Sequence, residues 1–202
     1  MNSQEITTLL DSFCTKQERT IVIVDYGNVE KWKKSLHWIV GMKELGQLAR
    51  NFSRGNLELR RFYYGSDYGS KESSMTMIEW SRAIIEKAEM SKFTIFTKRV
   101  KYIHDNSVQD GFEKKCDFDV EMAIDLIKLK DLYDIIILFS GDGDLMCAID
   151  YLHEQYNKDC YVFGARGHVG REVFDSKSKG SVIDIFFVED FEYRLNKRRF
   201  SL

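Results

Sequence analysis

The chain has 202 residues, with 30 Lys and Arg against 32 Asp and Glu and a formal net charge of −2. This length suits one domain with a single substantial core. The nearly balanced charge excludes a global basic field that would attract nucleic acid or a membrane surface, so any site for a polyanion has to be local.

Cysteine usage and the N-terminal residues predict a reducing, cytoplasmic setting. The four cysteines form no CxxC pair, and with four scattered histidines they do not favour a structural zinc site. The polar start "MNSQEITTLL" has no leader pattern, and no run approaches the ~18 apolar residues of a membrane span. We therefore expect no membrane partner.

Apolar strand-like runs alternate with helical patterns along the chain. Strands are predicted at 20–25, 57–64, 93–101, 134–139, 159–163 and 182–188, and helices at 38–52, 72–91, 118–131, 144–157, 170–178 and 190–195, with a weak helix near 3–14. Strands joined by helical crossovers form a mostly parallel sheet with helices on both faces. The predicted fold class is therefore α/β, a three-layer α/β/α sandwich.

Domain boundaries follow from the same pattern. Residues 1–18 are predicted to be an N-terminal helical or polar extension, residues 19–190 the domain itself, and residues 191–202 a basic C-terminal tail. One long polar stretch, 102–116, interrupts the alternation, and a loop of this length within a compact domain is often functional.

Two predicted strands end in carboxylates. "TIVIVD" ends at Asp25, and "DIIILF" runs into "SGDGD", which carries Asp142 and Asp144. If the strand order is the common 3-2-1-4-5, these strands are neighbours and their carboxyl ends share a cleft, where open parallel sheets bind ligands. Asp25 and Asp142 are then expected to face each other.

A third acidic segment opens into the same cleft. Asp117 and Asp119 stand at the start of the helix that leads into the "DIIILF" strand. Each of these acids, and Asp144, has the simpler interpretation of a helix N-cap, but the convergence of three segments favours a metal site. Oxygen ligands without His or Cys indicate Mg²⁺ or Mn²⁺. Such ions activate water and stabilise a leaving oxygen, so phosphoryl hydrolysis is the predicted chemistry.

Three motifs in this order resemble the NYN domain, a branch of the PIN-like nuclease group. They are "IVIVDYGNV", "KKCDFDVEMAIDLI" and "IILFSGDGDL". The resemblance implies a PIN-like, Rossmann-like topology and a metal-dependent ribonuclease. It implies metal ligands at Asp25, Asp119, Asp142 and Asp144 and a catalytic contribution from Asn28. Asp125 matches a further acid of the family, but its place on the helix points away from Asp119, so we expect only a supporting role.

Basic residues flank the acidic motifs and are candidates for substrate binding. Cations there would neutralise phosphates, and an interleaved Trp would stack a base. Loop charges are more simply solvated surface, and both interpretations stay open for each group. The candidates are Lys33, Lys34 and Trp32 after the first strand, Lys114 and Lys115 before the acidic helix, and Arg166, His168 and Arg171 after the fifth strand.

Two other functions remain open. The first is a non-catalytic RNA-binding or regulatory module in which the acids are structural. The second is a phosphatase with an Asp nucleophile, although Gly27 stands where the second acid of a DxD pair would be. The expected partner is RNA, single-stranded or structured, with DNA as a further candidate, and a homo-oligomer is compatible with the sequence.

Overall fold

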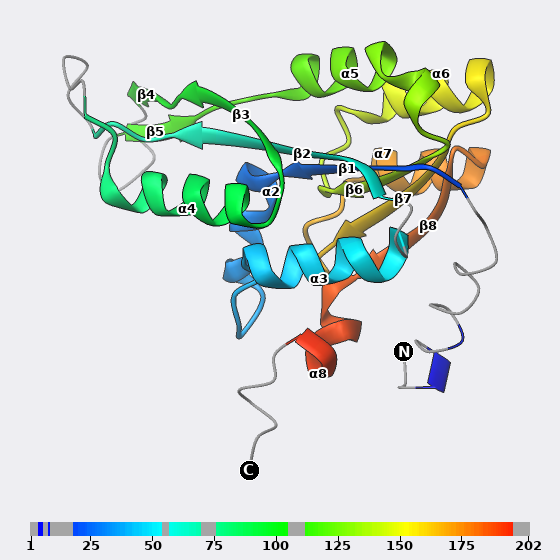
Figure 1. Ribbon diagram of the computed structural model, residues 1–202, viewed down its shortest axis with the longest axis horizontal. Coiled ribbons are helices and arrows are strands. Elements are labelled where there is room, and N and C mark those ends of the chain that lie inside the picture. The colour runs from blue at the N-terminus through cyan, green and yellow to red at the C-terminus, as the bar shows by residue number, and fades with distance from the viewer. Residues whose placement is uncertain are drawn as a thin grey trace.

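Figure 1 shows the computed structural model of the chain, which describes residues 4–5, 8, 18–53, 57–69, 76–104 and 112–195. Most of the predicted N-terminal extension lies outside these residues. The part of the basic tail beyond Leu195 also lies outside them.

The centre of the fold is a six-stranded sheet in the order β3-β2-β1-β6-β7-β8. Every neighbouring pair is parallel, as the helical crossovers predict. The strands are β1 (Thr20–Asp25), β2 (Leu57–Ser66), β3 (Thr94–Arg99), β6 (Ile135–Phe139), β7 (Asp159–Gly164) and β8 (Val182–Phe187). The predicted adjacency of the strands that end at Asp25 and in "SGDGD" is confirmed.

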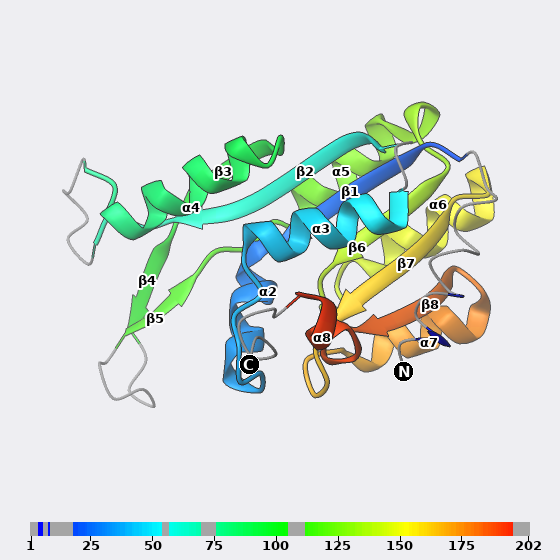
Figure 2. The same cartoon turned by 60° about the horizontal axis from the view of Figure 1, so that its bottom comes forward.

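Helices cover both faces of the sheet, which confirms the three-layer architecture (Figure 1). The helices α3 and α4 lie on one face, and α5 and α6 lie on the other (Figures 1 and 2). The α-helices are α2 (Tyr26–Lys31), α3 (Met42–Ser53), α4 (Glu79–Met90), α5 (Asp119–Lys128), α6 (Met146–Tyr156), α7 (Arg171–Lys179) and α8 (Glu192–Leu195), and short 3-10 helices span Trp32–Lys34, Lys130–Leu132 and Val188–Phe191.

The predicted loop at 102–116 contains strand structure instead. The predicted strand 93–101 ends at Arg99, and the chain continues into an antiparallel pair, β4 (Lys101–His104) and β5 (Phe112–Lys115). This pair forms a separate small sheet that projects beyond the ends of β2 and β3 (Figure 2). The interpretation of residues 102–104 and 112–115 as loop was wrong, because exposed charged side chains such as Lys114 and Lys115 do not show the apolar pattern of a buried strand. Residues 105–111 lie outside the described part of the chain.

Alternation along each strand builds two cores, one on each face of the sheet. Val22 and Val24 of β1 pack into the cluster on the α3 side, whereas Ile21 and Ile23 pack into the cluster on the α5 side. Successive strand side chains point to opposite faces, so a strand covered on both faces has to be apolar throughout. All five residues of β6 are buried for this reason.

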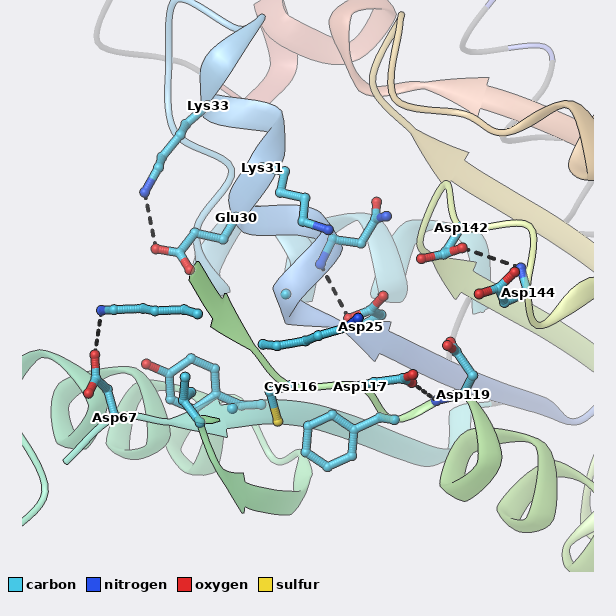
Figure 3. A pocket seen from close by; sticks show the side chains of 18 of the residues that line it. Asp25, Glu30, Lys31, Lys33, Asp67, Cys116, Asp117, Asp119, Asp142 and Asp144 are labelled. Atoms are coloured by element: carbon cyan, nitrogen blue, oxygen red, sulfur yellow. Dashed lines mark hydrogen bonds and ion pairs between the residues drawn. The ribbon is translucent and has the colours of Figure 1, made fainter. Parts of the chain in front are cut away.

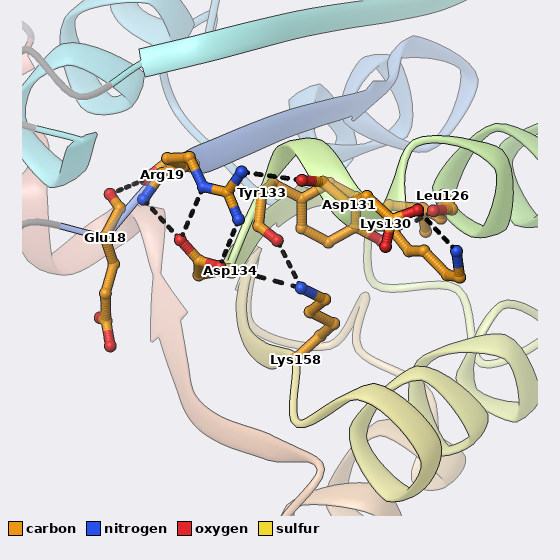
Figure 4. A network of polar contacts seen from close by, with 9 residues as sticks. Glu18, Arg19, Leu126, Lys130, Asp131, Tyr133, Asp134 and Lys158 are labelled. Carbon is orange, nitrogen blue, oxygen red and sulfur yellow. Dashed lines mark hydrogen bonds and ion pairs between the residues drawn. The ribbon is translucent and has the colours of Figure 1, made fainter.

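A polar network joins the strands at the edge opposite the acidic motifs (Figure 4). Arg19 donates to both carboxylate oxygens of Asp134, at 3.1 Å from Nε and 2.9 Å from Nη2. Lys158 is only 9% exposed, and its ammonium donates to the carbonyl of Tyr133 at 2.6 Å. The amino ends of β1, β6 and β7 are thereby tied together. No helix within the described residues is long and apolar enough to cross a membrane.

Replacing Lys158 with Met is expected to lower the free energy of unfolding by about 1–3 kcal/mol, because the buried Tyr133 carbonyl loses its donor. Chemical denaturation measures the change. Lys128→Met is the control, since Lys128 is exposed on α5, and it should stay within about 0.5 kcal/mol of the unaltered protein. Equal stabilities of the two variants would contradict a structural role for the buried ammonium.

Candidate active site

The carboxyl ends of β1 and β6 lie side by side. Val24 is paired with Phe139 in the parallel register, so Asp25 and Ser140 are the next residues on each strand. The Ser140 hydroxyl donates to Asp25 Oδ2 at 3.2 Å. The predicted juxtaposition of these two strand ends is therefore present, and it is held by a direct hydrogen bond.

Asp25 also begins the helix α2. Its Oδ1 accepts a hydrogen bond from the backbone N–H of Asn28 at 3.2 Å, so the carboxylate is the N-cap of this short helix. A carboxylate at this position satisfies an otherwise unpaired N–H group. Burial raises the pKa of Asp25, the bonds from Asn28 and Ser140 oppose this, and the nearby Asp142 charge raises it further.

Asn28 connects α2 to the turn after β6. Its Oδ1 accepts from the Gly141 backbone N–H at 2.9 Å and from the Trp32 indole N–H at 3.1 Å. Both partners are donors, so the oxygen of the amide faces them. Asn28, from which the resemblance implies a catalytic contribution, thus uses its amide oxygen to join two segments.

Hydrogen bonds within the "SGDGD" turn, and one to the loop before α7, fix its conformation. Ser140 Oγ accepts from the Asp142 N–H at 3.1 Å, and Asp142 Oδ1 accepts from the Asp144 N–H at 3.3 Å. The Gly141 carbonyl accepts from the Gly170 N–H at 2.8 Å. A Cβ on Gly141 would lie 1.8 Å from the carbonyl oxygen of His168, so the close approach of the two loops requires glycine there.

The N-terminus of α5 supplies the third acidic segment. Asp117 Oδ1 accepts from the Asp119 N–H at 2.9 Å, and this bond holds the pKa of Asp117 below its usual value. Burial, the Asp117 carboxylate and the charges of Asp142 and Asp25 raise the pKa of Asp119 to about 7. The acids of all three segments therefore act on one another.

All five predicted catalytic residues line one pocket of about 670 Å³, within the ~300–1,000 Å³ range usual for ligand sites. Figure 3 shows the acids of β1, α5 and the turn after β6 on its walls. The five are Asp25, Asn28, Asp119, Asp142 and Asp144. Among the residues that the structure describes, no three His, Cys, Asp or Glu side chains are gathered closely enough to hold one metal ion as they stand.

The other side of the same pocket is basic. Lys33, Lys34, Lys114 and Lys115 line it as predicted candidates, and Lys31 joins them. Lys33 pairs with Glu30 at 3.1 Å, whereas Lys114 pairs with Asp67. The lysines come from α2, the following 3-10 helix and the β4–β5 hairpin, and we call them the lysine wall of the pocket, which also carries Glu30 and Asp67.

Trp32 is a correction to the sequence interpretation. It is fully buried within the core on the α3 side, and its indole N–H is bonded to Asn28. A base cannot stack on a ring that is enclosed in the core. Trp32 follows α2 at the start of the 3-10 helix, where its side chain points into the core. The sequence did not indicate this direction, because the neighbouring lysines suggested an exposed segment.

Three further basic candidates do not line the pocket. Arg166 donates to both carboxylate oxygens of Asp190 at 2.9 Å, so its positive charge is already paired with a neighbouring acid. His168 contributes a backbone carbonyl against Gly141, and the Arg171 side chain is 89% exposed on α7 beside Asp175. Asp125 also lies outside the pocket lining, where it accepts a hydrogen bond from Tyr63 at 2.6 Å.

Asp67 and Trp80 line the pocket but were not among the predicted site residues. Asp67 follows β2, whose end neighbours that of β1, so the rule that located Asp25 and Asp142 could have found it. It accepts from Tyr102 at 2.6 Å and from Lys114. Burial raises the pKa of Asp67, but these hydrogen bonds outweigh burial and lower it. No comparable signal distinguished Trp80 in the sequence.

Comparison with known proteins agrees with this architecture. The family model described as the NYN domain matches residues 19–184. The Low amplitude and bright protein LabA of Synechococcus elongatus is 31% identical over 99 residues, which are 49% of this chain and 52% of that protein. The chain thus matches about half the length of this curated relative.

A solved structure shares the fold. It is the crystal structure of a protein of unknown function from Vibrio parahaemolyticus, with a TM-score of 0.62 and 18% sequence identity. The match covers 86% of this chain and 94% of the other.

Gly141→Ala is expected to destabilise the protein by about 1–3 kcal/mol, because the added methyl group has to displace the His168 carbonyl. Thermal unfolding measures the loss. Gly46→Ala is the matched control, since Gly46 lies in α3 and its Cβ would meet nothing within 4 Å. That variant should be unchanged or gain up to about 1 kcal/mol. A neutral Gly141→Ala would contradict the close packing of the two loops.

A double-mutant cycle tests the two hydrogen bonds that the Asn28 side chain accepts from Gly141 and Trp32. Asn28→Leu should destabilise the protein by at least about 2 kcal/mol, because the buried N–H groups of Gly141 and Trp32 lose their acceptor. Trp32→Phe removes one of those donors, so its cost should be smaller in the Asn28→Leu background. We expect a coupling of about 1 kcal/mol in denaturant unfolding. Strictly additive effects would show that the indole bond contributes nothing.

Proposed function

The chain belongs to the NYN domain family, a nuclease-like family, and from this membership and the acidic pocket we propose that it is a metal-dependent ribonuclease. The proposed metal ligands are Asp25, Asp119, Asp142 and Asp144. The proposed reaction is hydrolysis of an RNA phosphodiester bond. The observation that carries the proposal is that these four acids, from three separate segments, line one pocket.

The donor set fits a hard divalent cation. Every proposed ligand is a carboxylate, and oxygen-only sites suit Mg²⁺ or Mn²⁺. Burial is the main reason that the pKa values of Asp25 and Asp119 are raised, and repulsion by neighbouring carboxylates adds to it. A bound cation would relieve that repulsion. Because the carboxylates are not gathered around one point as they stand, binding would have to draw them together.

The residues of the chain have distinct parts in the proposed reaction. When bound, Mg²⁺ or Mn²⁺ supplies a Lewis acid that activates water and stabilises the leaving oxygen. Ser140 and the Asn28 N–H position the Asp25 carboxylate through their hydrogen bonds. Lysines on the opposite wall neutralise the phosphates of the substrate and hold the strand against the acids.

A non-catalytic RNA-binding module is the second candidate. The observation in its favour is that several acids already have structural hydrogen bonds. Asp25 caps α2, Asp117 accepts from Asp119, and Asp142 accepts from Asp144. In this alternative, RNA would bind the lysine wall without a metal.

The deciding experiment measures cleavage of single-stranded and structured RNA, with DNA alongside, in Mg²⁺, Mn²⁺ or EDTA. We expect cleavage that requires the metal. Asp142→Asn should reduce the rate by more than about 100-fold, since even residues that only support metal ligands are worth 10- to 100-fold. The fragment ends identify the bond that breaks.

Asp131→Asn is the matched control. Asp131 lies in the 3-10 helix before β6, at the opposite edge of the sheet, and its side chain is 80% exposed. This variant should cleave at the rate of the unaltered protein. Full activity of Asp142→Asn would refute the assigned ligands. Absence of cleavage in any metal, together with RNA binding that EDTA does not change, would favour the binding module.

A further inference from the structure

An exposed indole stands at the wall of the same pocket. The chain has three tryptophans. Trp32 is fully buried and Trp38 is 9% exposed, whereas Trp80 is 59% exposed and lines the pocket. A single exposed apolar side chain on a surface needs no explanation, but a large exposed aromatic ring at the wall of a charged pocket is accessible to whatever the pocket holds.

The start of α4 fixes the position of Trp80. The next residue, Ser81, is completely buried, and its hydroxyl bonds with the Tyr64 hydroxyl at 2.8 Å and accepts from the Asp67 N–H at 2.9 Å. The Ile78 N–H donates to the Asp67 carbonyl at 2.9 Å. Trp80 therefore stands on a helix turn that is bonded to the end of β2, so the backbone that carries the ring is held in place.

The lysines that line the pocket with Trp80 indicate what kind of ligand the pocket would bind. Lys31, Lys34 and Lys115 line the pocket with Trp80, and within the described part of the chain none of these three lysines forms an ion pair. Ammonium groups without ion pairs and an exposed aromatic ring in one pocket match a polyanion that carries flat rings. Nucleic acid has that chemistry, whereas an apolar peptide or a simple phosphate would use only one of the two features.

The indole and the acids are separated along the sheet. Asp25 is paired with Tyr63 of β2, and Asp67, to which the start of α4 is bonded, lies four residues further on. Four strand residues correspond to about 13 Å. A ligand that meets both the acids and Trp80 has to be extended, as a strand of nucleic acid is.

We propose that Trp80 stacks an unpaired base of a single-stranded nucleic acid whose phosphates lie along Lys31, Lys34 and Lys115. The inference rests on the proposed function, because it takes the same pocket to be where RNA is held. It goes further in assigning the substrate class: a duplex hides the faces of its bases, so only an unpaired base reaches the ring.

Tryptophan emission tests the stacking directly. The full chain is titrated with oligouridylate in EDTA, so that cleavage does not intervene. Of the three tryptophans only Trp80 is accessible, and we expect its emission to be quenched on binding. Duplex RNA of the same length should quench it much less. Equal quenching by the duplex, or no quenching by a single strand that binds, would overturn the inference.

Variants give a second, independent readout. The anisotropy of a labelled oligouridylate in EDTA should show affinity reduced roughly 5- to 150-fold in Trp80→Ala, the usual effect of removing a stacking ring. Trp80→Phe should retain most of the affinity because it keeps an aromatic face. Met90→Ala is the control, since Met90 is 83% exposed on the same helix outside the pocket lining. Unchanged affinity in Trp80→Ala would overturn the proposal.

The two proposals fail in different ways. Single-strand quenching without metal-dependent cleavage would refute the nuclease and support the stacking site. Cleavage by the unaltered protein, with no quenching and no loss of affinity in Trp80→Ala, would refute the stacking site alone.

Discussion

The parallel pairing of β1 with β6 is the constraint on which the site depends. Parallel strands end at the same edge, and here one strand ends in Asp25 and its neighbour runs into the turn that carries Asp142. The fold thus places like charges near each other, at a cost that other groups have to offset. The Ser140 hydroxyl and the Asn28 N–H do part of this through their bonds to Asp25. The glycines of the turn serve the same arrangement, because Gly141 allows the loop at 165–170 to pack against it and Gly143 leaves room for Glu172 of α7.

Strand topology explains how much of this was predictable from the sequence. Apolar runs ending in acids gave the positions of the strands, and the order of a doubly wound sheet then gave the shared cleft. The direction of Trp32 was not predictable, because it depends on the register of one short helix against the core. The engagement of Arg166 by Asp190 depends on a loop and a 3-10 helix that are distant in the sequence. Such pairings follow no local pattern.

Most of the charges that line the pocket are separated by element, although Glu30 lies on α2 beside the lysines and Asp67 follows β2. Acids come from the ends of β1 and β6 and from the start of α5, whereas lysines come from α2 with the following 3-10 helix and from the β4–β5 hairpin. Asp67 has a structural part in this arrangement. It pairs with Lys114 and accepts from Tyr102, so its charge serves to fasten the hairpin to the end of β2. The basic wall is therefore attached to the same sheet that carries the acids.

The two acids at the start of α5, Asp117 just before the helix and Asp119 at its first residue, show how local geometry gives two carboxylates different parts. Asp117 accepts the backbone N–H of Asp119, a bond that favours its ionised form and lowers its pKa. Asp119 has no such compensation: it is more enclosed, and it meets the charges of Asp117, Asp142 and Asp25, which raise its pKa to about 7. A carboxylate whose charge is already compensated gains little from a cation, whereas one that is repelled from several sides gains much. The resemblance already assigns the ligand to Asp119, and the hydrogen bond at the helix start gives a physical reason for preferring it to Asp117.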